Sequence, residues 1–180
     1  MKMTNELAEL AGIMCGDGCL SSCNGAYVIY ISGHKIDDRE YHEVTIKNLF
    51  LHSIGIPSGK KYSHLKIPTI IKENQYFALS FMRGLADTDG SIIFSKQHRT
   101  IGYYPRIEIA SKSESFLRES LSILTSNGFY GSVSRKWIHY RLEIPGFKNL
   151  DRWLNLIGFN NIKHIGKIEA RLGPITPPTR

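Results

Sequence analysis

A short glycine-containing motif occurs twice in this chain, and it limits the possible folds more than any other feature. Residues 10–18 read Leu-Ala-Gly-Ile-Met-Cys-Gly-Asp-Gly, and residues 82–90 read Met-Arg-Gly-Leu-Ala-Asp-Thr-Asp-Gly, at an offset of 72 positions. Both are apolar helical segments that close on an acid and a glycine, and we expect that glycine to end each helix in the left-handed conformation. Self-similarity at one fixed offset indicates two related halves built around equivalent helices.

The spacing within each copy predicts that the two helices pack together. Gly12 and Gly16 lie four residues apart and therefore share one helix face, as do the matching residues of the second copy. Small residues at such positions let two helix backbones approach closely. Asp17 and Asp89 would then meet at helix C-termini, where the helix dipole disfavours negative charge and a second carboxylate raises a pKa or requires a cation. The pattern predicts a divalent-metal site.

The paired motifs resemble the signature of the LAGLIDADG homing endonucleases, in the single-chain form that carries two copies. The second copy matches the family pattern at Gly84, Leu85, Asp87, Asp89 and Gly90. The first copy matches at Leu10, Ala11, Gly12, Asp17 and Gly18, but it has Cys15 where the family often has an acid. The resemblance covers about residues 4–170. One copy would be a weak signal, because Asp-Gly after an apolar helix is common, whereas two at a regular offset are specific.

The charge of the chain is uneven and basic. The net charge is +7 and the pI is near 9.3, and residues 1–80 are neutral, so the excess falls in residues 81–180. This balance indicates a nucleic-acid or anionic membrane partner, although a solubilising surface explains the charge alone equally well. No run approaches the ~18 apolar residues of a spanning helix. The N-terminus lacks the apolar core of a secretory signal, so we expect an intracellular protein with no membrane partner.

The three cysteines are Cys15, Cys19 and Cys23, each four residues from the next. Three thiolates without a nearby fourth ligand make a poor zinc site. His34 is a candidate for the fourth ligand, but structural zinc ligands usually occur as close pairs. Free thiols in a core are the preferred interpretation.

Periodicity and capping residues predict an α+β fold. In the first half we expect a helix capped by Thr4 or Asn5, strands at 19–22 and 26–32, a helix capped by Asp37 or Asp38 that runs to about residue 53, and short strands at 60–62 and 65–70. In the second half we expect the motif helix capped by Asn74, strands at 91–96 and 104–111, a helix opened by Ser113 and closed at 127–128, strands at 129–136 and 138–144, a helix over about 150–157, and a short basic helix at 163–172.

This order divides the chain into residues 1–73, an abbreviated first half, residues 74–172, a second half, and a frayed tail at 173–180. It matches the αββαββα repeat of the family. The resemblance implies two antiparallel sheets, related by a pseudo-twofold axis, that form a saddle over double-stranded DNA. The motif helices would make the central interface.

Basic and aromatic residues lie on the expected strands, as a DNA-binding surface requires, and a two-stranded ribbon fits the major groove. In the second half the candidates are Lys96, His98, Arg99, Arg106, Arg135, Lys136, His139 and Arg141. In the first half they are Tyr27, Tyr30, Lys60, Lys61, His64 and Lys66. Each tyrosine is also an ordinary strand residue by propensity. Which side chains face DNA depends on strand parity, which the sequence leaves open.

The resemblance also implies the catalytic residues. The final acid of each motif, Asp17 or Asp89, would hold Mg²⁺, with two or more ions in the site, together with Gly16 and Thr88, the residues that precede the acids. The family places basic or polar residues after the second strand of each half. Lys112 matches in the second half, and His34 or Lys35 in the first. Without the resemblance, Lys112 is equally well a solvated residue beside a helix cap.

Asp87 competes with Asp89 as the metal ligand of the second motif. Two residues on a helix are about 200° apart, so the two acids cannot both face the partner helix. The first motif has Cys15 in place of Asp87 and retains Asp17 in place of Asp89. We therefore expect Asp87 to be a helix-end residue that bonds a nearby backbone or basic group.

Together these observations predict a monomeric, Mg²⁺-dependent, site-specific DNA endonuclease of the homing type. One rival is a binding module on the same scaffold, either a maturase-like protein that folds intron RNA or a DNA-binding regulator. The other is a structural domain with two incidental Asp-Gly helix stops, which the basic and aromatic strands argue against.

Overall fold

The computed structural model describes the chain at residues 3–23, 26–33, 65–97 and 101–174. In chain order the elements are α1 (Asn5–Cys15), β1 (Gly18–Cys23), β2 (Ala26–Ile31), α2 (Thr69–Lys72), α3 (Gln75–Asp89), β3 (Gly90–Gln97), β4 (Ile101–Ser111), α4 (Glu114–Ser126), β5 (Ser132–Lys136), β6 (His139–Pro145), α5 (Phe147–Leu156) and α6 (Ile162–Leu172). The expected helix over 37–53 and the strand at 60–62 lie outside the described residues. No helix within these ranges is long and apolar enough to cross a membrane.

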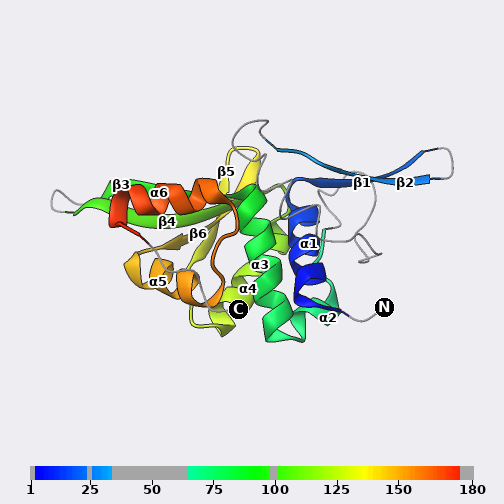
Figure 1. Cartoon of the computed structure of the whole chain (residues 1–180), viewed down its shortest axis with the longest axis horizontal. Coiled ribbons are helices and arrows are strands. Elements are labelled where there is room, and N and C mark those ends of the chain that lie inside the picture. The colour runs from blue at the N-terminus through cyan, green and yellow to red at the C-terminus, as the bar shows by residue number, and fades with distance from the viewer. Residues whose placement is uncertain (1–2, 24–25, 34–64, 98–100, 175–180) are drawn as a thin grey trace.

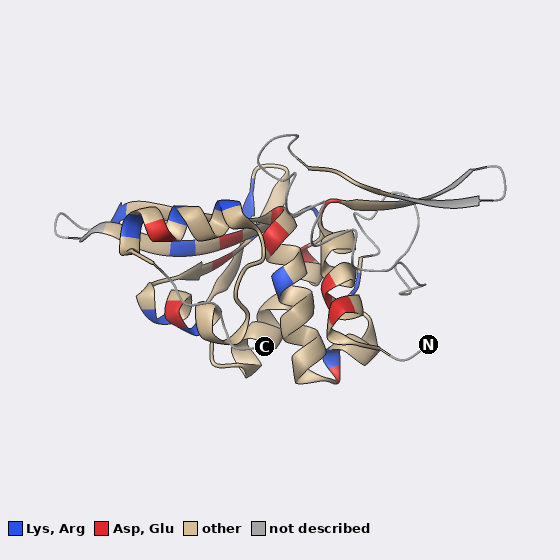
Figure 2. Ribbon diagram, viewed as in Figure 1, with Lys and Arg blue, Asp and Glu red and all other residues tan. Residues whose placement is uncertain are grey.

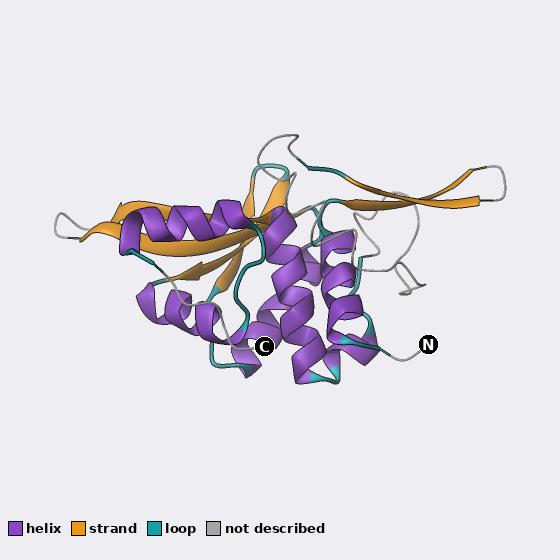
Figure 3. Cartoon of the chain, in the orientation of Figure 1, coloured by secondary structure: helices purple, strands orange, loops and turns teal. Residues whose placement is uncertain are grey.

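The fold is α+β, as predicted, with two antiparallel sheets. The hairpin β1–β2 forms one sheet, and the other has the strand order β3-β4-β6-β5. Helices α1 and α3 stand side by side at the centre of the molecule, and both sheets lie at the C-terminal end of this helix pair (Figure 1). The hairpin and the four-stranded sheet extend from it in opposite directions (Figure 3).

Side-chain caps begin the helices where the sequence predicts them. Thr4 Oγ1 accepts a hydrogen bond from the Leu7 backbone N–H, and Asn74 Oδ1 accepts from the N–H groups of residues 76 and 77 at the start of α3. Ser113 Oγ accepts from the Phe116 N–H at the start of α4. Each cap satisfies donors that a helix N-terminus otherwise leaves unpaired.

The core of the second half lies between the four-stranded sheet and its helices. Ile107 and Ile109 of β4 and Leu142 of β6 are buried against aromatic residues of α4 and α5. Trp153 stacks on Phe159 with ring centroids 5.6 Å apart, so the apolar stripe predicted around residues 150–157 does face the core.

Two expected strands differ from the structure. Residues 65–68 form no strand, and α2 follows directly, because the Ile67 N–H bonds Glu119 Oε2 (2.9 Å) instead of a strand and Pro68 favours the start of a helix. Strand β5 begins at Ser132 rather than at residue 129. The backbone N–H and C=O of Tyr130 are both bonded by the Asn149 side chain, which removes them from the sheet.

The glycines that end the two motifs also differ from expectation, because neither is left-handed. Gly90 has a φ of −89°, and neither it nor Gly18 is among the positive-φ glycines. The reason for glycine at these positions is steric. A Cβ on Gly90 would lie 2.2 Å from the Ala86 carbonyl oxygen, and one on Gly18 would lie 2.5 Å from the Met14 Cα. Each glycine lets the chain turn into a strand directly against the last helical turn.

Candidate metal and nucleic-acid site

The two motif helices touch backbone to backbone. A Cβ placed on Gly12 would lie 2.0 Å from the carbonyl oxygen of Phe81, and one on Gly84 would lie 2.1 Å from the carbonyl oxygen of Glu9. Real Cβ atoms do not approach a backbone oxygen so closely, so only glycine fits at either position. The contact is reciprocal between the copies and brings the C-terminal ends of α1 and α3 together.

The acid of the second motif reaches the end of the first. A Cβ on Gly16 would lie 3.4 Å from the carboxyl carbon of Asp89, and Gly16 directly precedes Asp17. Asp17 and Asp89 are both half-buried. The Thr88 hydroxyl donates to the Gly84 carbonyl of its own helix (3.0 Å), and it packs against Gly16, where a Cβ would lie 2.0 Å from it. Gly16 has no side chain, so any ligand from it would have to be its backbone carbonyl.

A pocket of about 280 Å³ opens at this junction. Its lining joins the two motifs to the four-stranded sheet, through Cys15, Gly16, Asp89, Ser111, Lys112 and His139. Lys112 is exposed and follows the last residue of β4, while His139 begins β6. The predicted acid and the predicted lysine of the second half therefore share one cavity, and His139 joins them.

The protein residues at this junction supply only some of the ligands that a hard cation such as Mg²⁺ needs. Within the described ranges, no group of three His, Cys, Asp or Glu side chains is placed to hold a metal ion. Mg²⁺ usually takes one or two protein carboxylates and completes its octahedron with water and substrate phosphate oxygens. Two half-buried carboxylates at the meeting of two helix ends fit that pattern, whereas a site built only from protein ligands does not.

Strand register separates the two faces of the four-stranded sheet. Ile107 and Ile109 point to the core, so Arg106 and Glu108 point to the opposite face, which we call the open face. Arg141 pairs with Ala110 and shares that face. Glu108 is buried between the two arginines, with Oε1 2.5 Å from Arg106 Nε and Oε2 2.9 Å from Arg141 Nη1. Both arginines are about one-third exposed.

Arg135 does not share the open face with Arg106 and Arg141. It pairs with Tyr140 on the β5–β6 ladder, in alternation with Ser134, which pairs with Arg141. The pKa of Glu114 on α4 is lowered, mainly by its hydrogen bond with Arg118, and the charge of Arg135 also contributes. Arg135 therefore lies near α4. The sequence-based prediction grouped Arg135 with Arg141, because the sequence alone does not determine which residues of a strand point to which face of the sheet.

The remaining predicted contact residues are scattered. Tyr30 on β2, Lys66, Lys96 and Lys136 are exposed. Tyr27 lies on β2, opposite Ser22, and its side chain is outside the described part. Also outside the described residues are His34, Lys35, Lys60, Lys61, His64, His98 and Arg99. Figure 2 shows further basic residues along α6, so the positive excess is not confined to the sheet.

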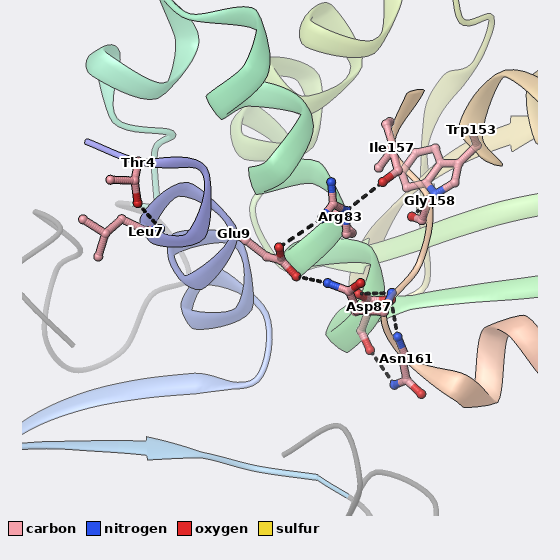
Figure 4. Close-up of polar contacts among 10 residues, drawn as sticks. Thr4, Leu7, Glu9, Arg83, Asp87, Trp153, Ile157, Gly158 and Asn161 are labelled. Carbon is pink, nitrogen blue, oxygen red and sulfur yellow. Dashed lines mark hydrogen bonds and ion pairs between the residues drawn. The ribbon is translucent and has the colours of Figure 1, made fainter. Parts of the chain in front are cut away.

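Asp87 lies in a different environment from Asp89. It is buried and accepts backbone N–H bonds from Asn160 (3.0 Å) and Asn161 (3.2 Å) (Figure 4). Burial raises the pKa of Asp87 to about 8 from 3.8, the two N–H bonds oppose this, and the charge of Glu9 adds to it. Asp87 therefore bonds a neighbouring backbone, as the comparison of the two motifs predicts.

The sequence did not indicate the partners of Asp87. Arg83 donates to Glu9 Oε2 (3.2 Å) and to the Ile157 carbonyl (2.7 Å), and the Asn160 amide donates to Glu9 Oε1. Glu9, Arg83 and Asp87 thus join α1 and α3 to the segment that precedes α6. These residues are far apart in the chain, so no local pattern reveals them. Glu108 was missed too, although its alternation with Ile107 and Ile109 is a signal for the open face.

Comparison with known proteins bears on the fold. Residues 77–158 match the family model of the LAGLIDADG-like domain. The matched stretch is a little under half of the chain, and it is this part of the chain that is similar to the domain. Two solved structures share its fold, at identities that support the fold alone. The N-terminal LAGLIDADG domain of DUF199/WhiA is 19% identical, with a TM-score of 0.58, covering 87% of this chain and 84% of that one. I-DmoI in complex with DNA and Mn is 16% identical, with a TM-score of 0.55, covering 86% and 96%.

A curated relative matches only in part. The tRNA-splicing ligase RtcB of Methanopyrus kandleri is 28% identical over 121 residues, which are 62% of this chain and 12% of that protein. The match thus spans a small part of the ligase. Other structures of I-DmoI, a homing endonuclease by description, hold target DNA with Mg or DNA with Ca. Divalent metals and DNA thus accompany this fold in solved structures.

Proposed function

We propose that this protein is a monomeric, divalent-metal-dependent endonuclease of the homing type, which cuts both strands of double-stranded DNA at a specific site. The observation that carries the proposal is the meeting of the two motif ends. The carboxyl group of Asp89 lies beside Gly16, the residue that precedes Asp17, and Gly16, Asp89 and Lys112 line one pocket. The structural likeness to a DNA-bound, metal-bound protein supports the same proposal.

The roles follow from the chemistry of phosphodiester hydrolysis. Asp17 and Asp89 would hold Mg²⁺, which when bound supplies a nucleophilic water and stabilises charge on the phosphate. In hydrolysis a bond would form between the water oxygen and phosphorus, and one phosphorus–oxygen ester bond would break. The attacking water would lose a proton to solvent, and the leaving sugar oxygen would take one from solvent. Lys112 lines the same pocket, and its ammonium group would offset the negative charge that grows on the phosphate oxygens. His34 or Lys35 is proposed for the matching role in the first half.

Substitution of either motif acid tests the proposal. Asp17→Asn and Asp89→Asn each remove one ligand charge while keeping the side-chain shape, so we expect double-strand cleavage to be lost and DNA affinity to be largely retained. Plasmid cleavage with Mg²⁺, followed on gels beside a filter-binding assay, measures both. A nicked product from one variant is compatible with the proposal. Cleavage of both strands at a near-normal rate would show that the substituted acid is not a ligand.

Lys112→Ala separates a catalytic role from a binding role. If Lys112 offsets charge that develops during cleavage, the cleavage rate falls more than the affinity, because that charge is absent from the ground state. Single-turnover cleavage with the enzyme in excess, together with the equilibrium affinity, gives the two quantities. Equal losses in rate and affinity would identify Lys112 as a phosphate anchor only.

A nucleic-acid-binding module without cleavage is the second candidate. The observation that favours it is the fold match to the WhiA domain, which is as strong as that to I-DmoI. Such a module would bind DNA or a structured intron RNA. Binding without cleavage under Mg²⁺ or Mn²⁺, and unchanged binding by both acid variants, would support this function over the endonuclease.

A further inference from the structure

The turn between β5 and β6 presents two large apolar side chains to solvent. Lys136 and His139 form the last pair of the ladder, so Trp137 and Ile138 are the turn itself. Trp137 is 92% exposed and Ile138 is 83% exposed. Apolar side chains this large are rarely left in water at a hairpin tip when a small polar residue would serve.

The backbone conformation of Trp137 is also one that a tryptophan rarely adopts. Its φ is +57°, in the left-handed region where a bulky side chain is a genuine outlier. Among the residues that the structure describes, every other positive φ belongs to a glycine. The first position of a two-residue hairpin turn with positive φ is ordinarily glycine, asparagine or aspartate. A tryptophan held there despite the strain, and without burial in the fold, indicates a use outside the fold.

The turn lies next to the candidate site. His139, two residues after Trp137, lines the pocket that holds Asp89 and Lys112. Two strand residues span roughly 7 Å, which is about two base-pair steps along the axis of a DNA duplex. In Figure 1 the β5–β6 hairpin stands at the sheet-bearing end of α3. A duplex held for cleavage in the pocket would therefore meet the turn within a few base pairs of the cut.

The charge around the turn favours a polyanion. Lys136 and His139 pair beside it, Arg141 lies on the same face of the hairpin, and residues 120–142 contain no Asp or Glu. An apolar tip with basic flanks suits an aromatic stack on bases and contacts to the adjoining phosphates. A protein partner with an apolar surface would leave this run of positive charge without a role.

We propose that Trp137, supported by Ile138, inserts between two stacked base pairs beside the cleavage site and bends the duplex. The inference rests on the proposed function for the position of the duplex. Apolar wedges of this kind unstack a base step and kink DNA. The kink costs least at flexible pyrimidine–purine steps, so the wedge adds sequence preference without a hydrogen bond to any base.

The experiment uses a duplex selected on the protein from a randomised library, and the full chain with Asp89→Asn so that the DNA stays intact. The fluorescent adenine analogue 2-aminopurine is placed at successive positions of the duplex. We expect emission to rise at one base step near the cut when the protein binds. Trp137→Gly should abolish the rise and weaken binding about ten- to a hundredfold, the worth of one stacked base. Trp137→Phe should keep part of both.

Trp137→Gly suits the left-handed backbone, so the variant folds, and its melting temperature verifies this. Tyr76→Ala is the matched control, because Tyr76 is 72% exposed at the opposite end of α3 and its loss should change nothing. The chain has two tryptophans, and Trp153 is fully buried. Quenching of the exposed tryptophan by acrylamide therefore reports on Trp137, and bound DNA should protect it.

The outcomes separate the inference from the proposed function. If DNA binds but neither protects Trp137 from acrylamide nor unstacks a base step, the wedge is wrong and the proposed endonuclease function is unaffected. Protection and unstacking without any cleavage by the wild type overturn the endonuclease and support the wedge. If Trp137 is protected without DNA, the wedge is wrong. Protection that rises with protein concentration would indicate self-association, and protection on addition of anionic vesicles would indicate a membrane surface. Absence of DNA binding overturns both.

Discussion

Asp87 and Asp89 are two residues apart on α3, yet they lie in opposite surroundings. Asp87 is buried under the segment that precedes α6 and accepts two backbone N–H bonds, whereas Asp89 is half-buried in the pocket with Lys112. A helix turns about 200° over two residues, which separates them. The first motif, with Cys15 in place of Asp87, indicated this division because only one of the two acids is repeated.

Asp87→Asn is expected to change stability and its pH dependence, with cleavage largely kept. The pKa of Asp87 is raised from 3.8 to about 8, so the native state holds a proton that the unfolded chain releases between these values. This carboxyl group therefore makes the free energy of unfolding fall as pH rises from about 4 to about 8. The amide of the variant would not titrate and has one oxygen for two N–H donors, so the substitution costs about 1–3 kcal/mol at low pH.

Urea unfolding of both proteins at pH 5 and pH 8 checks this expectation. The difference in stability between wild type and variant should be largest at pH 5 and should shrink toward pH 8. Asp89→Asn is the control, because its pocket position predicts lost cleavage with unchanged unfolding. An inactive Asp87→Asn enzyme with normal stability at both pH values would show that the repeat misidentifies the catalytic acid.

At the scale of elements, the contact between α1 and α3 depends on the absence of two Cβ atoms. Gly12→Ala and Gly84→Ala would each place a methyl group within about 2 Å of a carbonyl oxygen of the other helix. The helices must separate to relieve the overlap, and we expect at least ~3 kcal/mol of destabilisation. Thermal or urea unfolding measures it. Gly166→Ala on α6 is the matched control, with nothing within 4 Å of its Cβ, and it should stabilise by about 0.5–1 kcal/mol. Equal effects at both sites would contradict the close packing.

Local signals predicted most of the described elements, and tertiary contacts account for the failures. Thr4, Asn74 and Ser113 cap helices because capping needs only the next few residues. The strand expected at 65–70 failed because Ile67 finds its partner in Glu119, which is distant in the chain. Strand β5 starts late because Asn149 takes the backbone groups of Tyr130. No window of neighbouring residues contains either partner.

The candidate site was predictable only where the repeat constrains it. Asp17 and Asp89 follow from the motif, and Lys112 follows from the resemblance. The residues of the open face could not be predicted in this way. A shift of one residue in strand register moves every side chain of a strand, Arg135 included, to the other face of the sheet. The counter-charge Glu108 was likewise missed, since its burial between Arg106 and Arg141 depends on pairing across three strands.

The whole molecule carries its positive excess in residues 81–180, so DNA affinity should fall steeply as salt increases. Arg141 lies on the open face, one-third exposed, whereas Arg135 lies on the face toward α4. If the open face binds the phosphates, Arg141→Gln should reduce the slope of log affinity against log salt by about one, and Arg135→Gln should leave it unchanged. Both variants remove one charge from neighbouring strands, so each controls for net charge in the other. Fluorescence anisotropy with a labelled duplex over a range of KCl concentrations measures the slopes. A reduced slope for Arg135→Gln alone would place the duplex on the other side of the sheet.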